Sequence, residues 1–215
     1  MTIMETLSSF ISIILHLDIY LNQIVLEYKS ATYAILFFII FLETGLVAVP
    51  FLPGDSLLFA AGAISALGTL NPLWLIALLS FAAILGDTVN YWIGRHAGSK
   101  LYSMETRFIK KEHLDKTQHF YDKHGGKTII IARFIPIIRT FAPFVAGIGK
   151  MSYSRFLSFN LIGGILWVTL FISGGYYFGN IPIIKQNFTL VIMTIIVISL
   201  MPAILEFLKH YRKKK

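Results

Sequence analysis

Five ionisable residues lie inside stretches of sequence that are otherwise apolar enough to cross a lipid bilayer. Glu43, Asp55 and Asp87 are in the first half of the chain, and Arg133 and Arg139 are in the second. A charge at the bilayer centre costs about 2.5–3.5 kcal/mol on insertion scales, so five unpaired charges would cost roughly 10 kcal/mol or more. We therefore expect these side chains to face one another or a wet cavity. This makes a central polar site, built by both halves, the main functional hypothesis.

The two arginines are the candidate groups for binding an anion. A guanidinium is always charged, and its planar fork fits phosphate with two parallel hydrogen bonds. Arg133 and Arg139 flank Pro136, and this arrangement does not suit one continuous helix. We expect the proline break to direct both side chains into one cavity. The alternative is that both extend to the cytoplasmic lipid headgroups.

The acidic residues are candidates for binding protons or cations. Glu43 lies twelve residues after the start of the apolar run 31–49. Burial and a neighbouring arginine push a carboxyl pKa in opposite directions, so this side chain is suited to bind and release a proton. Its structural alternative is an ion pair with Arg133 or Arg139. Asp87 is either a cavity residue or an interfacial residue that pairs with Arg95.

The remaining acid belongs to the sequence Pro53-Gly54-Asp55-Ser56, which we interpret as a hairpin tip that opens a short helix. Asp55 or Ser56 can cap the free backbone N–H groups there, and the helix N-terminus favours anions nearby. The alternative role for Asp55 is capping alone.

The composition predicts the elements that position these side chains. The chain has 215 residues, of which 56% are hydrophobic and only 14% charged, with a mean hydropathy of +0.71. A soluble domain has about 25% charged residues. We therefore predict an all-α polytopic membrane protein with one membrane domain over residues 31–208. We interpret residues 1–30 as an interfacial amphipathic helix, and four apolar runs as full spans: 31–49, 73–93, 156–178 and 188–208.

Two further apolar segments are interrupted too often to cross the membrane as helices. Segment 50–72 begins with Pro50, Pro53 and Gly54, and segment 128–149 contains Pro136 and Pro143. Basic residues concentrate in the loop 95–127 and in the tail 209–215, so we expect both of these, and both termini, to be cytoplasmic. The two interrupted segments then enter from opposite faces as re-entrant hairpins. This is the layout of inverted-repeat transporters, whose substrate site lies near the membrane midplane.

Several classes of function have no support in the sequence. The absence of cysteine excludes disulfides and thiolate chemistry. The histidines of the loop 95–127 do not follow a metal-site pattern, and no nucleophile–base motif indicates an enzyme. The net charge of +8 has no nucleic-acid-binding motif beside it. We expect no cofactor, metal or nucleic acid, and membrane lipids as neighbours of the polybasic tail. The oligomeric state, including a homo-oligomer, stays open.

Ordered motifs run along most of the chain, at 41–45 (FLETG), 50–55 (PFLPGD), 86–87 (GD), 123–127 (KHGGK), 132–136 (ARFIP) and 139–143 (RTFAP). Together they resemble the DedA family of bacterial inner-membrane proteins, part of the VTT or SNARE-associated superfamily. The resemblance implies a transporter fold with two opposed re-entrant hairpins. It also implies transport of a polyprenyl phosphate carrier, such as undecaprenyl phosphate, for cell envelope synthesis. The family's two acids and two arginines correspond here to Glu43, Asp55, Arg133 and Arg139.

We therefore expect a lipid-phosphate flippase rather than an enzyme. Arg133 and Arg139 would hold the phosphate, and Glu43 and Asp55 would couple its movement to a proton or cation gradient, with support from Asp87 and Ser56. One alternative is a proton-coupled small-ion antiporter, although two arginines in the site would repel a cation. Another is a non-transporting factor for envelope assembly or homeostasis, which would tolerate Arg139→Lys. The exact lipid, the direction of transport and the coupling ion are not specified by the sequence.

Overall fold

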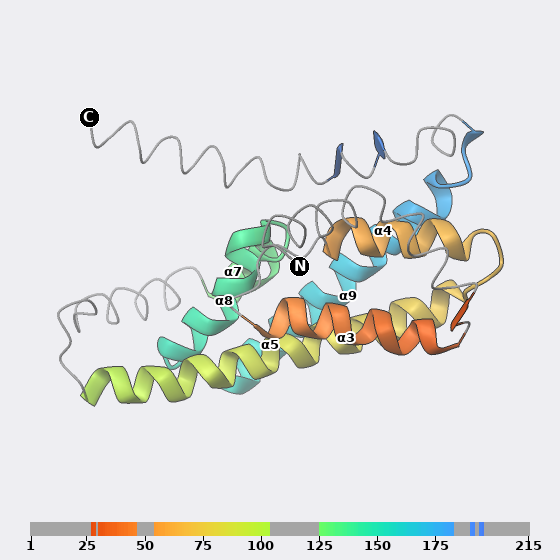
Figure 1. The fold of residues 1–215 in the computed structure, drawn as a ribbon. Coiled ribbons are helices and arrows are strands. Elements are labelled where there is room, and N and C mark those ends of the chain that lie inside the picture. The colour runs from red at the N-terminus through yellow and green to blue at the C-terminus, as the bar shows by residue number, and fades with distance from the viewer. Residues whose placement is uncertain are drawn as a thin grey trace, which may run out of the picture. The chain divides into compact units, whose positions relative to one another are not determined.

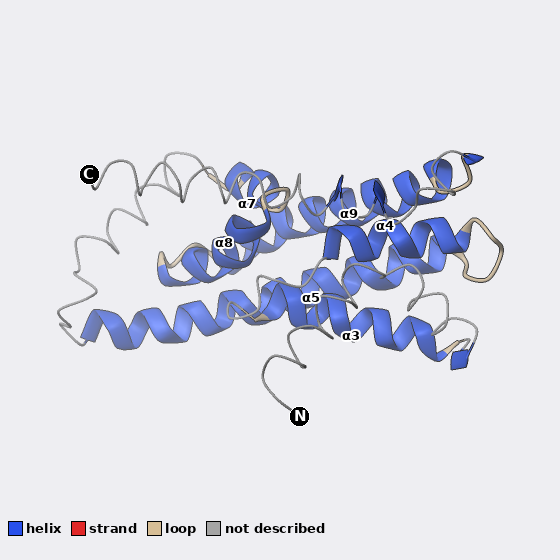
Figure 2. Ribbon diagram, turned by 45° about the horizontal axis from the view of Figure 1, so that its top comes forward, coloured by secondary structure: helices blue, strands red, loops and turns tan. Residues whose placement is uncertain are grey.

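The computed structural model describes residues 27–28, 30–46, 54–103, 125–182, 190–191 and 194–195. In this part of the chain the regular structure is helical, and no strand occurs (Figures 1 and 2). The prediction of an all-α protein is confirmed. The main helices are α3 (Ala31–Gly45), α4 (Gly54–Ser65), α5 (Pro72–Ser103), α7 (Lys127–Ala132), α8 (Pro136–Ile148) and α9 (Tyr153–Phe178). Among the described residues, the segments Pro72–Ala97 and Tyr153–Phe178 are long and apolar enough to cross a membrane.

Several predicted segments lie wholly or mostly outside the described residues. These are the N-terminal helix 1–30, Pro50 and Pro53, residues 104–124 of the predicted loop 95–127, the predicted span 188–208 and the tail 209–215. Helix α5 differs from its prediction. The helix α5 continues to Ser103, well past the expected membrane exit at residue 93. The stretch after residue 93 contains no proline, and Arg95 Nη1 donates a hydrogen bond to the hydroxyl of Tyr91 one turn earlier, at 2.7 Å.

The chain forms two compact units. Unit 1 comprises residues 1–37, 53–78 and 168–215, and unit 2 comprises residues 38–52 and 79–167. The helices α3, α5 and α9 each contribute residues to both units.

In unit 1, every residue of the short helix α4 is buried. Small side chains allow α4 and α9 to approach closely. A Cβ added to Gly62 would meet the backbone of Ile172, and one added to Gly175 would meet the backbone of Phe59 and Ala63. Packing through small residues is typical of membrane helices, because lipid is as apolar as leucine and association depends on close contact.

The turn between α4 and α5 follows from local sequence chemistry. Gly68 has φ +83°, in the left-handed region that favours glycine. Asn71 Oδ1 accepts hydrogen bonds from the backbone N–H groups of Leu73 and Trp74, at 2.9 and 3.1 Å. Asn71 therefore caps α5, and Pro72 occupies the first helical position, where its missing N–H has no cost. Helix α4 and this turn make up the described part of the predicted hairpin 50–72.

In unit 2, the predicted hairpin 128–149 is broken at the first of its two prolines. Helix α7 ends at Ala132 and α8 begins at Pro136, and Ile135 between them is extended (φ −119°, ψ 106°), as expected before proline. The predicted break at Pro143 is wrong, because this residue lies inside α8. A proline there removes one intrahelical hydrogen bond, and tight packing of α8 against α5 keeps the helix in place.

Three glycines bring the helices of unit 2 together. A Cβ on Gly86 of α5 would collide with Thr44 of α3, one on Gly94 of α5 with the backbone of Phe144, and one on Gly147 of α8 with the backbone of Tyr91. The close approach of α5 to both α3 and α8 positions the polar side chains described next.

Candidate functional site

The first part of the candidate site is an ion pair between α3 and α8. Arg139 Nη2 lies 2.6 Å from Glu43 Oε1, and the two side chains are 3% and 1% exposed. Glu43 is in the last turn of α3, and Arg139 is one turn into α8. Because both groups are shielded from water, each depends on its partner for the stabilisation that solvent would otherwise provide.

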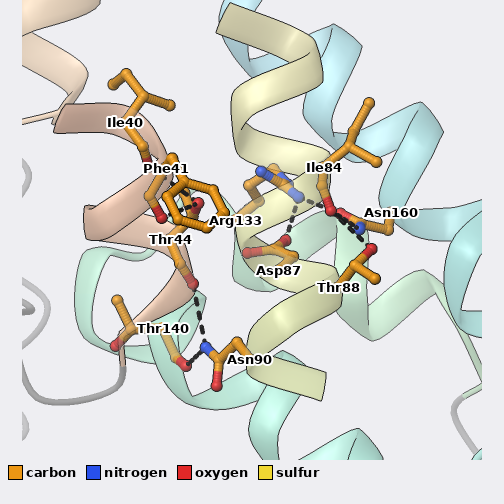
Figure 3. A network of polar contacts seen from close by, with 10 residues as sticks. All are labelled: Ile40, Phe41, Thr44, Ile84, Asp87, Thr88, Asn90, Arg133, Thr140 and Asn160. Carbon is orange, nitrogen blue, oxygen red and sulfur yellow. Dashed lines mark hydrogen bonds and ion pairs between the residues drawn. The ribbon is translucent and has the colours of Figure 1, made fainter. Parts of the chain in front are cut away.

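The second part centres on Arg133, which caps the C-terminus of α7. Its Nη2 donates to Asp87 Oδ2 on α5 and to Asn160 Oδ1 on α9 (Figure 3). The Arg133 side chain is 1% exposed. Asn160 is itself fixed, because its Nδ2 donates to the carbonyl of Ile84 at 3.1 Å. Glycines 163 and 164 lie beside the Arg133 side chain and leave room for it.

Trp167 on α9 connects the two arginines. Its ring centroid is 4.8 Å from Arg139 Cζ and 5.9 Å from Arg133 Cζ, and the side chain is fully buried. Both distances are within the range of cation–π attraction. The two guanidiniums therefore share one aromatic surface, although they come from opposite sides of the proline break.

Asn90 fixes the spacing between the helices that carry the Glu43–Arg139 pair. Its Nδ2 donates to the carbonyl of Thr44 at 3.1 Å and to the carbonyl of Thr140 at 2.7 Å (Figure 3). Thr44 follows Glu43 on α3, and Thr140 follows Arg139 on α8. One buried amide thus joins the backbones next to both members of the ion pair.

The four charges of this cluster cancel. Glu43 and Asp87 contribute two carboxylates, and Arg133 and Arg139 contribute two guanidiniums. Arg133 also has two buried donors, Nε and Nη1, with no hydrogen-bond partner among the described residues. An incoming anion could therefore bind here by replacing a carboxylate on a guanidinium. In the described part of the chain, no three His, Asp or Glu side chains are grouped to hold a metal ion.

The structure brings together four of the residues that the sequence singled out: Glu43, Asp87, Arg133 and Arg139. It does not pair Asp87 with Arg95, whose guanidinium instead bonds to Tyr91 and to the carbonyl of Met151. Both candidate arginines are buried in protein, so neither extends to the lipid headgroups.

Asp55 and Ser56 belong to the other unit. Both are buried in the first turn of α4, with exposed fractions of 6% and 1%. Of the predicted breaks, Gly54 is the first residue of α4 and Pro136 the first of α8.

Sequence reasoning missed Asn160 and Trp167 as members of the cluster. Asn160 carried a usable signal, because it is a polar residue inside the apolar run 156–178, where such residues usually face a partner. Trp167 carried none, since a tryptophan in a membrane span is equally compatible with lipid contact. Asn90 carried the same kind of signal, because it is a polar residue near the inner end of the apolar run 73–93.

Comparison with known proteins identifies the family. Residues 52–177 match the VTT domain. Protein DedA of Escherichia coli K12 is 53% identical over 212 residues, which cover 97% of each chain. The chain belongs to the DedA family. This confirms the resemblance inferred from the motifs, and it makes the chain a membrane protein.

More distant relatives align over most of the chain. An uncharacterized membrane protein of Mycobacterium leprae is 42% identical, over 82% of this chain and 79% of its own. Inner membrane protein YghB of Escherichia coli K12 is 37% identical, over 74% of this chain and 73% of its own. No solved structure matches the chain.

Proposed function

We propose that this DedA-family protein is a flippase for a polyprenyl phosphate carrier, such as undecaprenyl phosphate, in the bacterial inner membrane. One observation carries the proposal: two buried guanidiniums flank a proline break and contact the same tryptophan. Guanidinium is the side chain best suited to bind phosphate with two hydrogen bonds. A lipid substrate fits an intramembrane site, because its chain can stay in the bilayer while only the headgroup enters the protein.

The ion pairs suggest how binding would be coupled to protons. In the structure, the Glu43 carboxylate is bound to the Arg139 guanidinium. A proton on Glu43 would weaken this pair and let the phosphate take the guanidinium, and loss of the proton would restore the pair and expel the phosphate. Asp55, buried at the start of α4, would be the second coupling group, with Ser56 beside it.

The proposal includes a membrane topology. Segments 50–72 and 128–149 would be re-entrant hairpins from opposite faces, with four full spans and both termini in the cytoplasm. The break at Pro136 supports this arrangement, since irregular backbone at membrane depth is tolerated where it lines a site. The location in the inner membrane is supported by the name of the relative YghB.

A proton-coupled small-ion antiporter is the second candidate. The observation that favours it is the charge balance of the cluster, because two carboxylates neutralise the two arginines. Repulsion of a cation by the arginines is therefore weaker than the sequence alone implied. The two candidates differ in what they require of Arg139: lipid phosphate binding needs the planar fork, and ion exchange does not.

The test is lipid translocation by purified protein in proteoliposomes, followed as the accessibility of undecaprenyl phosphate. Wild type is expected to move the lipid, and Arg139→Lys to slow it about tenfold or more, because lysine keeps the charge and loses the fork. Arg155→Lys is the matched control, since Arg155 is exposed on α9. Equal rates for wild type and Arg139→Lys would contradict the phosphate site. Absence of translocation by folded wild type would reject the flippase.

A further inference from the structure

The donor pattern of Arg133 limits how an anion can bind to it. A guanidinium has two edges that present parallel donors, one formed by Nε and Nη2 and the other by Nη1 and Nη2. Both edges use Nη2. In the structure, Nη2 is occupied by Asp87 Oδ2 and Asn160 Oδ1, whereas Nε and Nη1 have no hydrogen-bond partner among the described residues. A tetrahedral anion could reach one open donor, but two-point binding requires it to displace one of the two residues.

The two occupants of Nη2 are not equivalent. Asn160 is held by the carbonyl of Ile84 and carries no charge. Asp87 is an anion on the same donor, and its second oxygen, Oδ1, has no hydrogen-bond partner in the described part of the chain. An incoming anion gains most by replacing the other anion, because both compete for the same positive charge.

We propose that Asp87 is a displaceable counter-ion, and that a phosphate monoester headgroup binds Arg133 by taking its place while Asn160 stays. The displaced carboxylate takes up one proton from the aqueous phase, so that anion and proton are bound together and released together. This inference rests on the proposed function and deepens it. It adds Asp87 to the site and makes Asn160 the residue that positions Arg133.

The charged surroundings of Asp87 are consistent with this exchange. Arg133 contacts it directly, and Arg139 on α8 also acts on it electrostatically. Arg133 in turn interacts electrostatically with both Asp87 and Glu43. If a phosphate entered while Asp87 kept its charge, the cluster would hold an extra anion in a site shielded from water. Protonation of Asp87 removes one negative charge, which balances a phosphate monoester that binds as the monoanion, and this is why proton uptake accompanies binding.

The experiment measures binding of dodecyl phosphate to the full-length protein in neutral detergent. Trp167 contacts both guanidiniums, so its fluorescence reports on the site once Trp74 and Trp92 are replaced by phenylalanine. In this background, Asp87→Asn is expected to tighten binding about tenfold, because the competing charge is gone and the shape is kept. Asn160→Asp is expected to weaken binding, because a second anion then occupies Arg133.

Two control variants distinguish competition between anions for Arg133 from a general disturbance of the structure. Ser158→Ala, two positions before Asn160, changes an exposed residue of α9 whose hydroxyl donates to the carbonyl of Ser154 on the same helix, and it should leave the affinity unchanged. Asn160→Leu removes the hydrogen bond without adding charge, and it should weaken binding less than Asn160→Asp. As the pH is lowered from about 8 to about 6, the ratio of the wild-type dissociation constant to that of Asp87→Asn should decrease. The reason is that only wild type takes up a proton at Asp87. Ionisation of the ligand affects both proteins equally.

The outcomes are distinct. Unchanged or weaker binding by folded Asp87→Asn overturns the inference. If Asp87→Asn does not fold, Asn160→Asp decides: weaker binding than Asn160→Leu supports the inference, and equal binding overturns it. Failure of the proposed function is recognised differently, as a wild type that binds dodecyl phosphate but translocates no undecaprenyl phosphate.

Discussion

Glu43 and Arg139 form a buried ion pair at 2.6 Å although 96 residues separate them in the chain. The pair joins the end of α3 to the first turn of α8. Asp87 and Arg133 form a second buried pair, and the ring of Trp167 contacts the guanidiniums of both Arg133 and Arg139. Buried ion pairs contribute little net stability, because desolvation offsets the attraction. The proposed exchange of partners would give these charges a role other than stability.

Removing one member of the Glu43–Arg139 pair should destabilise the protein more than removing both. Glu43→Leu alone removes the carboxylate that pairs with the buried Arg139 guanidinium, and we expect it to lower the free energy of unfolding by about 3–5 kcal/mol. The double variant Glu43→Leu/Arg139→Leu should be clearly more stable than the single one. Thermal unfolding in detergent measures both. A double variant less stable than Glu43→Leu would show that the pair does not behave as an isolated buried ion pair.

The sequence predicted the helical class, the charged cluster and the break at Pro136, because each depends on local or compositional rules. Long apolar runs form helices in lipid, and charges inside such runs need partners. A proline in the interior of a helix removes one backbone hydrogen bond, so it often ends or breaks the helix. Pro143 shows the limit of the last rule. There the contacts of Phe144 and Gly147 with α5 outweigh the lost bond, and these contacts are tertiary.

The pairing of individual charges could not be predicted from sequence. Asp87 could have bonded to Arg95 two turns away on the same helix, and local reasoning favoured this choice equally. The structure pairs it with Arg133, because Gly86 and Gly94 draw α5 against neighbouring helices and Arg95 bonds to Tyr91 instead. Which of several buried partners a side chain meets depends on helix rotation and spacing, and these are set by contacts distant in sequence.

Glu43→Gln should uncouple lipid movement from the proton gradient. Glutamine resembles the protonated acid in shape and charge, so Arg139 would stay available to phosphate at every pH. We expect translocation in proteoliposomes to continue without responding to an imposed pH gradient, whereas wild type responds. Glu27→Gln, at an exposed position, is the control. Slower translocation by Glu43→Gln that still responds to the pH gradient as wild type does would argue against Glu43 as the coupling residue.

Asn90→Leu should destabilise unit 2. The substitution removes the donor that serves the carbonyls of Thr44 and Thr140 and places an apolar group against them. The expected loss in the free energy of unfolding is about 1–3 kcal/mol, the cost of leaving buried polar groups unsatisfied. Thermal unfolding measures it, with Thr88→Val on the same helix as the control. A Tm of Asn90→Leu equal to that of wild type would mean that the two carbonyls do not depend on this side chain.

Two adjacent glycines of α9 give a matched test of the packing in unit 1. A Cβ at Gly175 would collide with the backbone of Phe59, which cannot move aside as a side chain can, whereas one at Gly174 would lie 3.8 Å from the Phe59 ring, an ordinary contact. Gly175→Ala should therefore cost about 1–3 kcal/mol or more through overpacking. Gly174→Ala should be neutral or stabilise the protein by up to about 1 kcal/mol, because alanine favours helix. The comparison of the two Tm values cancels the change in helix propensity, so equal values would show that α4 and α9 are not in backbone contact at this position.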